Sequence, residues 1–116
     1  MQDPIRPPCS EQGLPRIGLL SAETTAQIAK ALAHPARIRI LEQFEGCQPR
    51  IAQDIVSHCS LAQSTVSEHL RILREAGVLF ARKDGPRTWY CVRRSVLRAF
   101  ADAVNDIAAE KVLVTS

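Results

Sequence analysis

Long apolar runs and aromatic side chains are both scarce in this chain of 116 residues. No apolar stretch reaches the roughly 18 residues that a membrane-spanning helix needs, and the first residues lack the continuous apolar segment of a secretory signal. Aromatic residues make up 4% of the chain, whereas hydrophobic residues as a whole make up 46%. We therefore expect one small cytoplasmic domain without a membrane partner, with a core built mainly from Leu, Ile, Val and Ala.

The four cysteines also lack the spacing of a metal or disulfide motif. Cys9, Cys47, Cys59 and Cys91 are far apart, and no Cys-x-x-Cys pair is present. This spacing favours reduced thiols over a disulfide framework. Gly-rich phosphate loops and the Gly-x-Ser-x-Gly and His-Glu-x-x-His motifs are missing as well, so the sequence argues against an enzyme.

Residues 60–79, SLAQSTVSEHLRILREAGVL, have the pattern of the second half of a helix-turn-helix. Val66, Leu70 and Leu73 step by 4 and 3, which is the spacing of a buried helical face. The opposite face begins with short hydrogen-bonding side chains: Gln63, Ser64, Thr65 and Ser67. A helix of this kind suits insertion into the DNA major groove.

Positive charge is concentrated in the second half of the chain. Positions 71 to 98 hold eight Lys or Arg residues and two acids, whereas the whole chain has a net charge of +3. A basic stripe beside a helix-turn-helix suits a phosphate backbone, although a solvated basic face is the alternative reading of the charge alone.

The residues predicted to contact DNA divide into four groups. The first group, Gln63, Ser64, Thr65 and Ser67, faces base edges or flanking phosphates, and Arg71 and Arg74 add charge toward the backbone. His69 either contacts a phosphate or packs beneath its helix. Arg82, Lys83 and Arg87 hold the adjacent minor groove or phosphates.

The remaining pattern predicts a mainly α fold with a two-stranded β-wing, a winged helix-turn-helix in the order α-α-α-α-β-β-α. Helices are expected over about 22–33, 36–44, 50–58, 62–75 and 95–110. The β-rich runs 78–80 and 88–92 flank the turn residues 84–86 and form the wing. Residues 1–18 form a flexible, Pro-containing arm, and residues 19–112 form the DNA-binding and dimerisation domain.

Two helices carry faces that suit a second copy of the chain. The first helix has a face of small residues, and the last helix has an apolar stripe along its whole length. The predicted interface residues are Ala22, Ala26, Ala29, Val96, Phe100, Val104 and Ile107. Packing of the stripe within its own domain is the alternative.

Three segments together resemble the ArsR/SmtB family of winged-helix repressors. They are ALAHPARIRIL at 31–41, LAQSTVSEHLRILREAGVL at 61–79 and DGPRTWYCV at 84–92. The resemblance implies a homodimer that represses transcription from an operator with an imperfect inverted repeat. In such families a ligand or metal often releases the DNA.

The resemblance leaves the effector open. The thiolate pair that many members carry before the recognition helix is replaced here by Ile51 and Gln53. The last helix has no His for the zinc site of other members. Some arsenic-responsive relatives use thiols from the arm and from the loop after the second helix, which suggests Cys9 and Cys47 for As(III) or another thiophilic metal. The alternatives for the effector are thiol oxidation, a small molecule, or no effector at all. The alternative for the function is a winged helix that binds protein or RNA.

Overall fold

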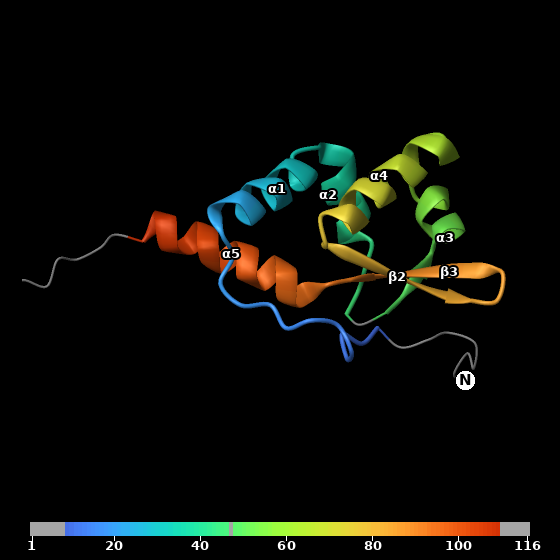
Figure 1. The fold of residues 1–116 in the computed structure, drawn as a ribbon. Helices are drawn as coiled ribbons and strands as arrows, with labels where there is room; N and C mark the ends of the chain where they lie inside the picture. The colour runs from blue at the N-terminus through green and yellow to red at the C-terminus, as the bar shows by residue number, and fades with distance from the viewer. Residues whose placement is uncertain (1–8, 47, 110–116) are drawn as a thin grey trace, which may run out of the picture.

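The computed structural model describes residues 9–46 and 48–109, which form five helices and three strands in this range. In chain order they are α1 (Ala22–Leu32), α2 (Pro35–Glu42), β1 (Arg50–Ile51), α3 (Ala52–Ser57), α4 (Gln63–Glu75), β2 (Leu79–Asp84), β3 (Arg87–Val92) and α5 (Arg94–Ala108). Helices α1 to α4 pack above the sheet, and α5 runs beneath α1 toward the opposite end of the molecule (Figure 1). The predicted winged helix-turn-helix fold is confirmed.

Local side chains set where the first two helices begin. The Ser21 hydroxyl accepts the Thr24 amide at 3.1 Å and caps α1. His34 caps α2 through Nδ1, which accepts the Ala36 amide at 3.1 Å, and Pro35 occupies the first helical position. Proline suits this position because its missing N–H would have no partner there and its φ is already helical.

The sheet has one strand that the sequence pattern did not indicate. Its order is β1-β3-β2, with Arg50 and Ile51 of β1 paired antiparallel to Tyr90 and Trp89 of β3. The helix predicted over 50–58 is therefore wrong at its start, and α3 begins only at Ala52. Because the pairing partners are 38 and 40 residues apart in sequence, no local pattern could reveal this strand.

A tight hairpin joins β2 and β3. Asp84 pairs with Arg87, so only Gly85 and Pro86 form the loop. Gly85 has a φ of +63°, and proline cannot adopt a positive φ. Positive φ at the first loop residue alone is the requirement of a type II′ turn, whose twist matches that of the strands.

The end of α4 sets the direction in which the chain enters the wing. Gly77 has a φ of +83°. Its amide donates to the Arg74 carbonyl, and the Val78 amide donates to the Leu73 carbonyl at 3.0 Å. These two bonds form a Schellman motif, which satisfies the last carbonyls of α4 and turns the chain directly into β2.

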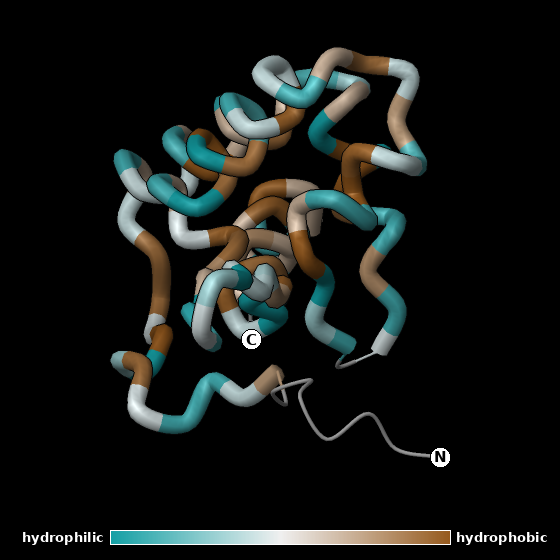
Figure 2. Tube along the Cα trace, turned by 90° about the vertical axis from the view of Figure 1, so that its right-hand side faces the viewer, coloured by the Kyte–Doolittle hydropathy of each residue, from teal (hydrophilic) through white to brown (hydrophobic). Residues whose placement is uncertain are grey.

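The core lies where α1, α2, α3 and α4 meet the sheet and the start of α5. Hydrophobic segments gather toward the centre of the trace, and hydrophilic segments lie around its outside (Figure 2). The buried cluster consists of Ile28, Ile40, Phe44, Ile55, Val66, Leu70, Leu73, Val78, Leu79, Val92 and Val96. This mainly aliphatic core matches the expectation from composition and packs α4 against the sheet.

Candidate nucleic-acid interface

Helix α4 divides into a buried side and an exposed side as its sequence predicts. Val66, Leu70 and Leu73 lie in the core. The exposed residues at its N-terminal end are Gln63, Ser64, Thr65 and Ser67. This end of α4 and the tip of the wing lie at the same end of the molecule, with α3 between them (Figure 1).

The first turn of α4 carries no side-chain cap within the described part of the chain. Its N-cap residue is Ala62, which has no acceptor, so the first amides keep their N–H groups available. No acidic residue lies in this turn. The aligned peptide dipoles also give the N-terminus of a helix partial positive charge. This end of α4 therefore suits a phosphate or a base-edge acceptor.

His69 is among the residues predicted to contact DNA, and this prediction needs correction because the side chain does not face outward. The residue is 7% exposed, its Nδ1 accepts Arg37 Nε at 3.1 Å, and its ring centroid lies 4.6 Å from that of His34. Burial, together with the nearby His34 and Arg37, lowers the pKa of His69, so the neutral ring is favoured. His69 thus packs beneath the helix, the second of the two roles considered for it.

Arg71 is exposed, but two carboxylates of its own helix surround its charge. It pairs with Glu68 one turn before and with Glu75 one turn after. Its Nε donates to Glu68 Oε2 at 2.9 Å. Hydrogen bonding to Glu68 raises the pKa of Arg71 and lowers that of Glu68. The spacing of the three residues in the sequence already indicated these ion pairs. A phosphate would have to compete with Glu68 and Glu75 for the Arg71 guanidinium.

The other predicted cations are exposed. Arg74, Arg82, Lys83 and Arg87 form no ion pair within residues 9–46 and 48–109. The last three lie in the outer half of the hairpin, where Lys83 is opposite Thr88 and Arg82 is opposite Trp89. The wing therefore presents three positive charges at the same end of the molecule as the start of α4 (Figure 1).

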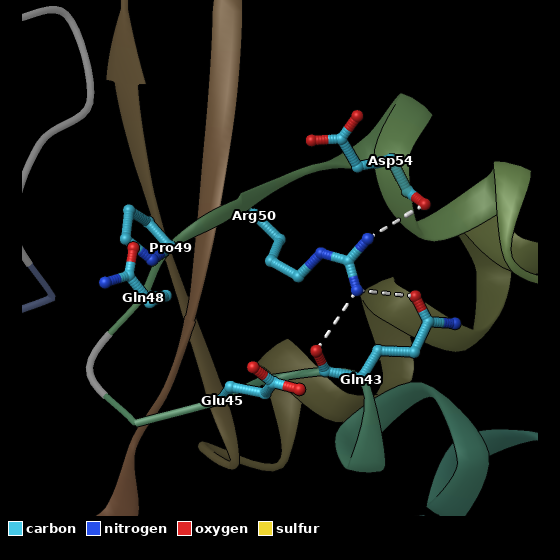
Figure 3. A pocket seen from close by; sticks show the side chains of 6 residues that line it. All are labelled: Gln43, Glu45, Gln48, Pro49, Arg50 and Asp54. Atoms are coloured by element: carbon cyan, nitrogen blue, oxygen red, sulfur yellow. Dashed lines mark hydrogen bonds between the residues drawn. The ribbon is translucent and has the colours of Figure 1, made fainter. Parts of the chain in front are cut away.

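Arg50 is a cation with a different task, which the sequence did not reveal. Its Nη1 donates to the Gln43 carbonyl at 3.1 Å and to Gln43 Oε1 at 2.8 Å, and its Nη2 donates to the Asp54 carbonyl at 3.1 Å. Figure 3 shows this guanidinium reaching between the end of α2 and α3, on one side of a pocket of about 500 Å³. Arg50 thereby fixes the first helix of the helix-turn-helix rather than offering its charge outward.

The residues predicted for the dimer interface differ in their exposure, and one of them needs a correction. Val104 is 44% exposed and Ile107 is 82% exposed, and Phe100 is partly buried against the core. Val96 is 4% exposed and belongs to the buried core cluster of its own chain. On α1 the three predicted alanines, Ala22, Ala26 and Ala29, are all exposed.

The cysteines differ from the expectation of reduced thiols. Cys9 and Cys91 form a disulfide between residues 82 positions apart, so that expectation is wrong for this pair. Cys59 is a free thiol, as expected. It packs against the core, and Gln43 Nε2 lies 3.4 Å from its sulfur. Cys47 lies outside the described residues, and the Cys9/Cys47 ligand pair stays a prediction.

Neither a metal cluster nor a membrane span is found in the described part of the chain. No group of three or more His, Cys, Asp or Glu side chains there could hold a metal ion. No helix among these residues is both long and apolar enough to cross a membrane.

Comparison with known proteins gives a consistent picture. The family model for bacterial regulatory proteins of the arsR family matches residues 34–79. An uncharacterized HTH-type transcriptional regulator of Mycobacterium tuberculosis, Rv0081, is 42% identical over 67 residues, which are 58% of this chain and 59% of the relative. The chain thus matches less than two thirds of this relative's length. The transcriptional repressor SdpR of Bacillus subtilis is 31% identical over 67% of this chain and 82% of its own.

Solved structures agree with these sequence relatives. The crystal structure of Rv0081 superposes with a TM-score of 0.58 at 36% identity and covers 74% of this chain and 87% of that one. The homodimeric winged helix-turn-helix DNA-binding domain Mb0332 of Mycobacterium bovis gives a TM-score of 0.60 at 30% identity, covering 74% and 79%. The fold and the exposed face of α4 thus define a winged helix-turn-helix protein. The chain belongs to the ArsR family of bacterial regulatory proteins.

Proposed function

We propose that this protein is a homodimeric transcriptional repressor that binds an operator with an imperfect inverted repeat. The observation that carries the proposal is the common placement of two surfaces at one end of the molecule (Figure 1). One is the exposed, uncapped start of α4, and the other is the wing with Arg82, Lys83 and Arg87. A helix entering the major groove while a cationic hairpin follows the backbone is the way such folds bind DNA.

Specificity and affinity come from different residues in this proposal. Gln63, Ser64, Thr65 and Ser67 carry hydroxyl and amide groups that can read base edges. Arg74 and the three wing cations neutralise phosphates, which strengthens binding to every sequence. Arg71 has a smaller part because Glu68 and Glu75 already surround it.

Dimerisation is proposed through the part of α5 that one chain leaves uncovered. Val104 and Ile107 expose apolar surface that would be removed from water in a dimer. The M. bovis domain with the same fold is homodimeric, which supports a dimer. Two recognition helices related by a two-fold axis would reach half-sites about 34–36 Å apart.

In vitro selection from a random duplex library tests this function. The enriched sequences should contain an inverted repeat, and a single half-site should bind much more weakly than the full repeat. A shuffled duplex of the same length and composition is the control. Equal binding to selected and shuffled DNA, or a preference for RNA, would refute a sequence-specific repressor.

The proposal for the effector concerns two cysteines, Cys9 and Cys47. Release of the operator by arsenite through Cys9 and Cys47 requires that the Cys9–Cys91 disulfide first be reduced, because its sulfurs cannot otherwise bind a metalloid. Arsenite should then release the operator from the reduced wild type and not from the Cys9→Ser/Cys47→Ser double variant. Release that persists in this variant would rule the site out.

A further inference from the structure

The segment before α1 is attached to the rest of the molecule at both of its ends. Residues 9–20, which we call the docked arm, run beneath α5 from the sheet to the start of α1 (Figure 1). At its far end Ile17 and Leu20 pack against the core, and at its near end Cys9 is bonded to Cys91 of β3. The disulfide thus ties the arm to the strand that also forms the wing.

Polar contacts beside the disulfide place the arm at the start of α5. The N-cap residue of α5, Arg93, provides no side-chain cap within the described residues. The Glu11 carboxylate takes that role from a distance in sequence. It accepts the Ser95 amide at 3.2 Å, the Ser95 hydroxyl, and Arg93 Nε at 3.2 Å. A carboxylate at this position also interacts favourably with the helix dipole.

The charged state of Glu11 contributes to this contact. Burial by itself raises the pKa of the carboxyl, but the hydrogen bonds from Ser95 and Arg93 outweigh it, so the pKa lies below its ordinary value. Arg93 also donates to the Pro15 carbonyl of the arm. The arm is therefore fixed by one covalent bond, by a small set of polar contacts, most of them within two residues of Cys9, and by the packing of Ile17 and Leu20.

The arm also covers part of α5, on a face that Ala99 and Ala103 share with Asp102 and Asp106. Residues 17–20 and the α5 residues Ala99 and Ala103 line one groove, and Leu19 on the arm is 98% exposed. The sequence reasoning missed Leu19 because it lies outside any periodic segment. A displacement of the arm would uncover this face of α5 and move the exposed Leu19, and would therefore change the surface offered to a second copy.

The two sulfur atoms differ in their access to reagents. Cys91 is 2% exposed, whereas Cys9 is half-buried. A surface pocket of about 370 Å³ lies against Cys9, with Arg94 and Arg98 among its lining residues. An incoming thiolate can therefore approach the Cys9 sulfur, and Cys91 is the sulfur that leaves.

From these contacts we propose that Cys9 and Cys91 form a reversible thiol–disulfide site that controls docking of the arm and, through it, dimerisation. This proposal rests on the dimeric function proposed above. Oxidised protein has the docked arm and the tighter dimer. In reduced protein Glu11 is no longer held near Arg93 and Ser95 by a covalent bond, so the arm leaves α5 for part of the time.

A dithiol reduces the Cys9–Cys91 disulfide, and a small disulfide forms it again. A thiolate of the dithiol attacks Cys9 Sγ, the Sγ–Sγ bond breaks, and Cys91 leaves as a thiolate that takes up a proton. The second thiol of the reductant then displaces Cys9, so two electrons and two protons reach the protein and the reductant becomes a cyclic disulfide. Oxidised glutathione reverses the process by accepting the two electrons and becomes two glutathione thiols.

Two measurements on the full chain test the proposal, using dithiothreitol as the reductant. Sedimentation equilibrium should give a dimer dissociation constant at least ten-fold higher after reduction. Trypsin should cleave after Arg16 at least ten-fold faster, because the arm is then undocked. Both changes should reverse with oxidised glutathione.

Cysteine variants show which thiol is responsible for the change in dimerisation and cleavage on reduction. Cys9→Ser should behave like reduced wild type under all conditions, and Cys59→Ser should respond like wild type. Unchanged dimerisation and cleavage on reduction would overturn the proposal, and so would a response that persists in Cys9→Ser or disappears in Cys47→Ser.

The two proposals fail in different ways. An oxidised dimer that responds to reduction but binds no operator would refute the repressor and support the thiol–disulfide site. An oxidised protein that is monomeric would refute the dimer in both proposals, and trypsin cleavage would then report on arm docking alone.

Discussion

The wing charge offers the sharpest test of how this protein would bind DNA. Arg87 is exposed, forms no ion pair within the described residues, and lies beside the tip of the hairpin. Arg87→Ala should remove a phosphate contact from each protomer without disturbing the core. We expect binding to weaken on specific and random DNA by a similar factor.

The magnitude follows from counterion release. Each neutralised phosphate contributes about −0.9 to the slope of log K against log salt. A dimer loses two contacts, so the slope should become shallower by about 1.8. Between 50 and 200 mM salt the ratio of the wild-type to the Arg87→Ala association constant should therefore fall by roughly 12-fold. Fluorescence anisotropy with a labelled operator across this salt range measures the slope directly.

A matched control separates this local contact from the effect of net charge. Lys30→Ala removes the same charge from an exposed position on α1, away from the wing in Figure 1, and should leave the slope nearly unchanged. Equal changes in the two variants would mean that net charge alone is measured. A changed base preference with an unchanged slope in Arg87→Ala would refute the assignment of Arg87 to the backbone.

Three further variants probe the other surfaces. Gln63→Ala should cost about 1–3 kcal/mol on the operator and far less on random DNA if it loses a base contact, and equal losses by anisotropy would reassign Gln63 to the backbone. Val104→Asp should give a folded monomer by sedimentation, because this side chain is already half exposed in one chain, whereas Asn105→Asp should remain dimeric; an intact Val104→Asp dimer would exclude this part of α5. The lowered pKa of His69 means that the unfolded chain binds more protons in mild acid. The free energy of unfolding should therefore fall as the pH drops below the unfolded-state pKa of about 6.5. The urea midpoint of His69→Gln should depend less on pH between 6.5 and 5 than that of the wild type. An equal pH dependence in the two proteins would contradict this.

Much of the fold follows from patterns within a few residues. The step of 4 and 3 between Val66, Leu70 and Leu73 places one side of α4 in the core. Gly77 and Gly85 have the positive φ values that end α4 and close the hairpin. Because helix periodicity, capping and tight turns depend on near neighbours, the sequence was sufficient for the winged helix-turn-helix and for the polar face of α4.

Contacts between distant residues could not be read in the same way. His69 has a place in the recognition helix that suggests a phosphate, and only the packing of α2 against α4 turns its ring toward Arg37 and His34. Val96 fits the apolar stripe of a dimer helix, yet it is buried in the core cluster of its own chain. Periodicity shows which face is apolar but not what covers it.

The sequence by itself determined the class of fold, the cationic wing and the exposed hydrogen-bonding groups of α4. Only the tertiary structure decided that Arg50 bridges α2 and α3, that Glu11 caps α5, and that Cys9 meets Cys91. The two cysteines are 82 residues apart, and their meeting depends on where the wing strand ends and on how the arm crosses α5. Such pairings depend on the arrangement of whole elements in space, which no local spacing encodes.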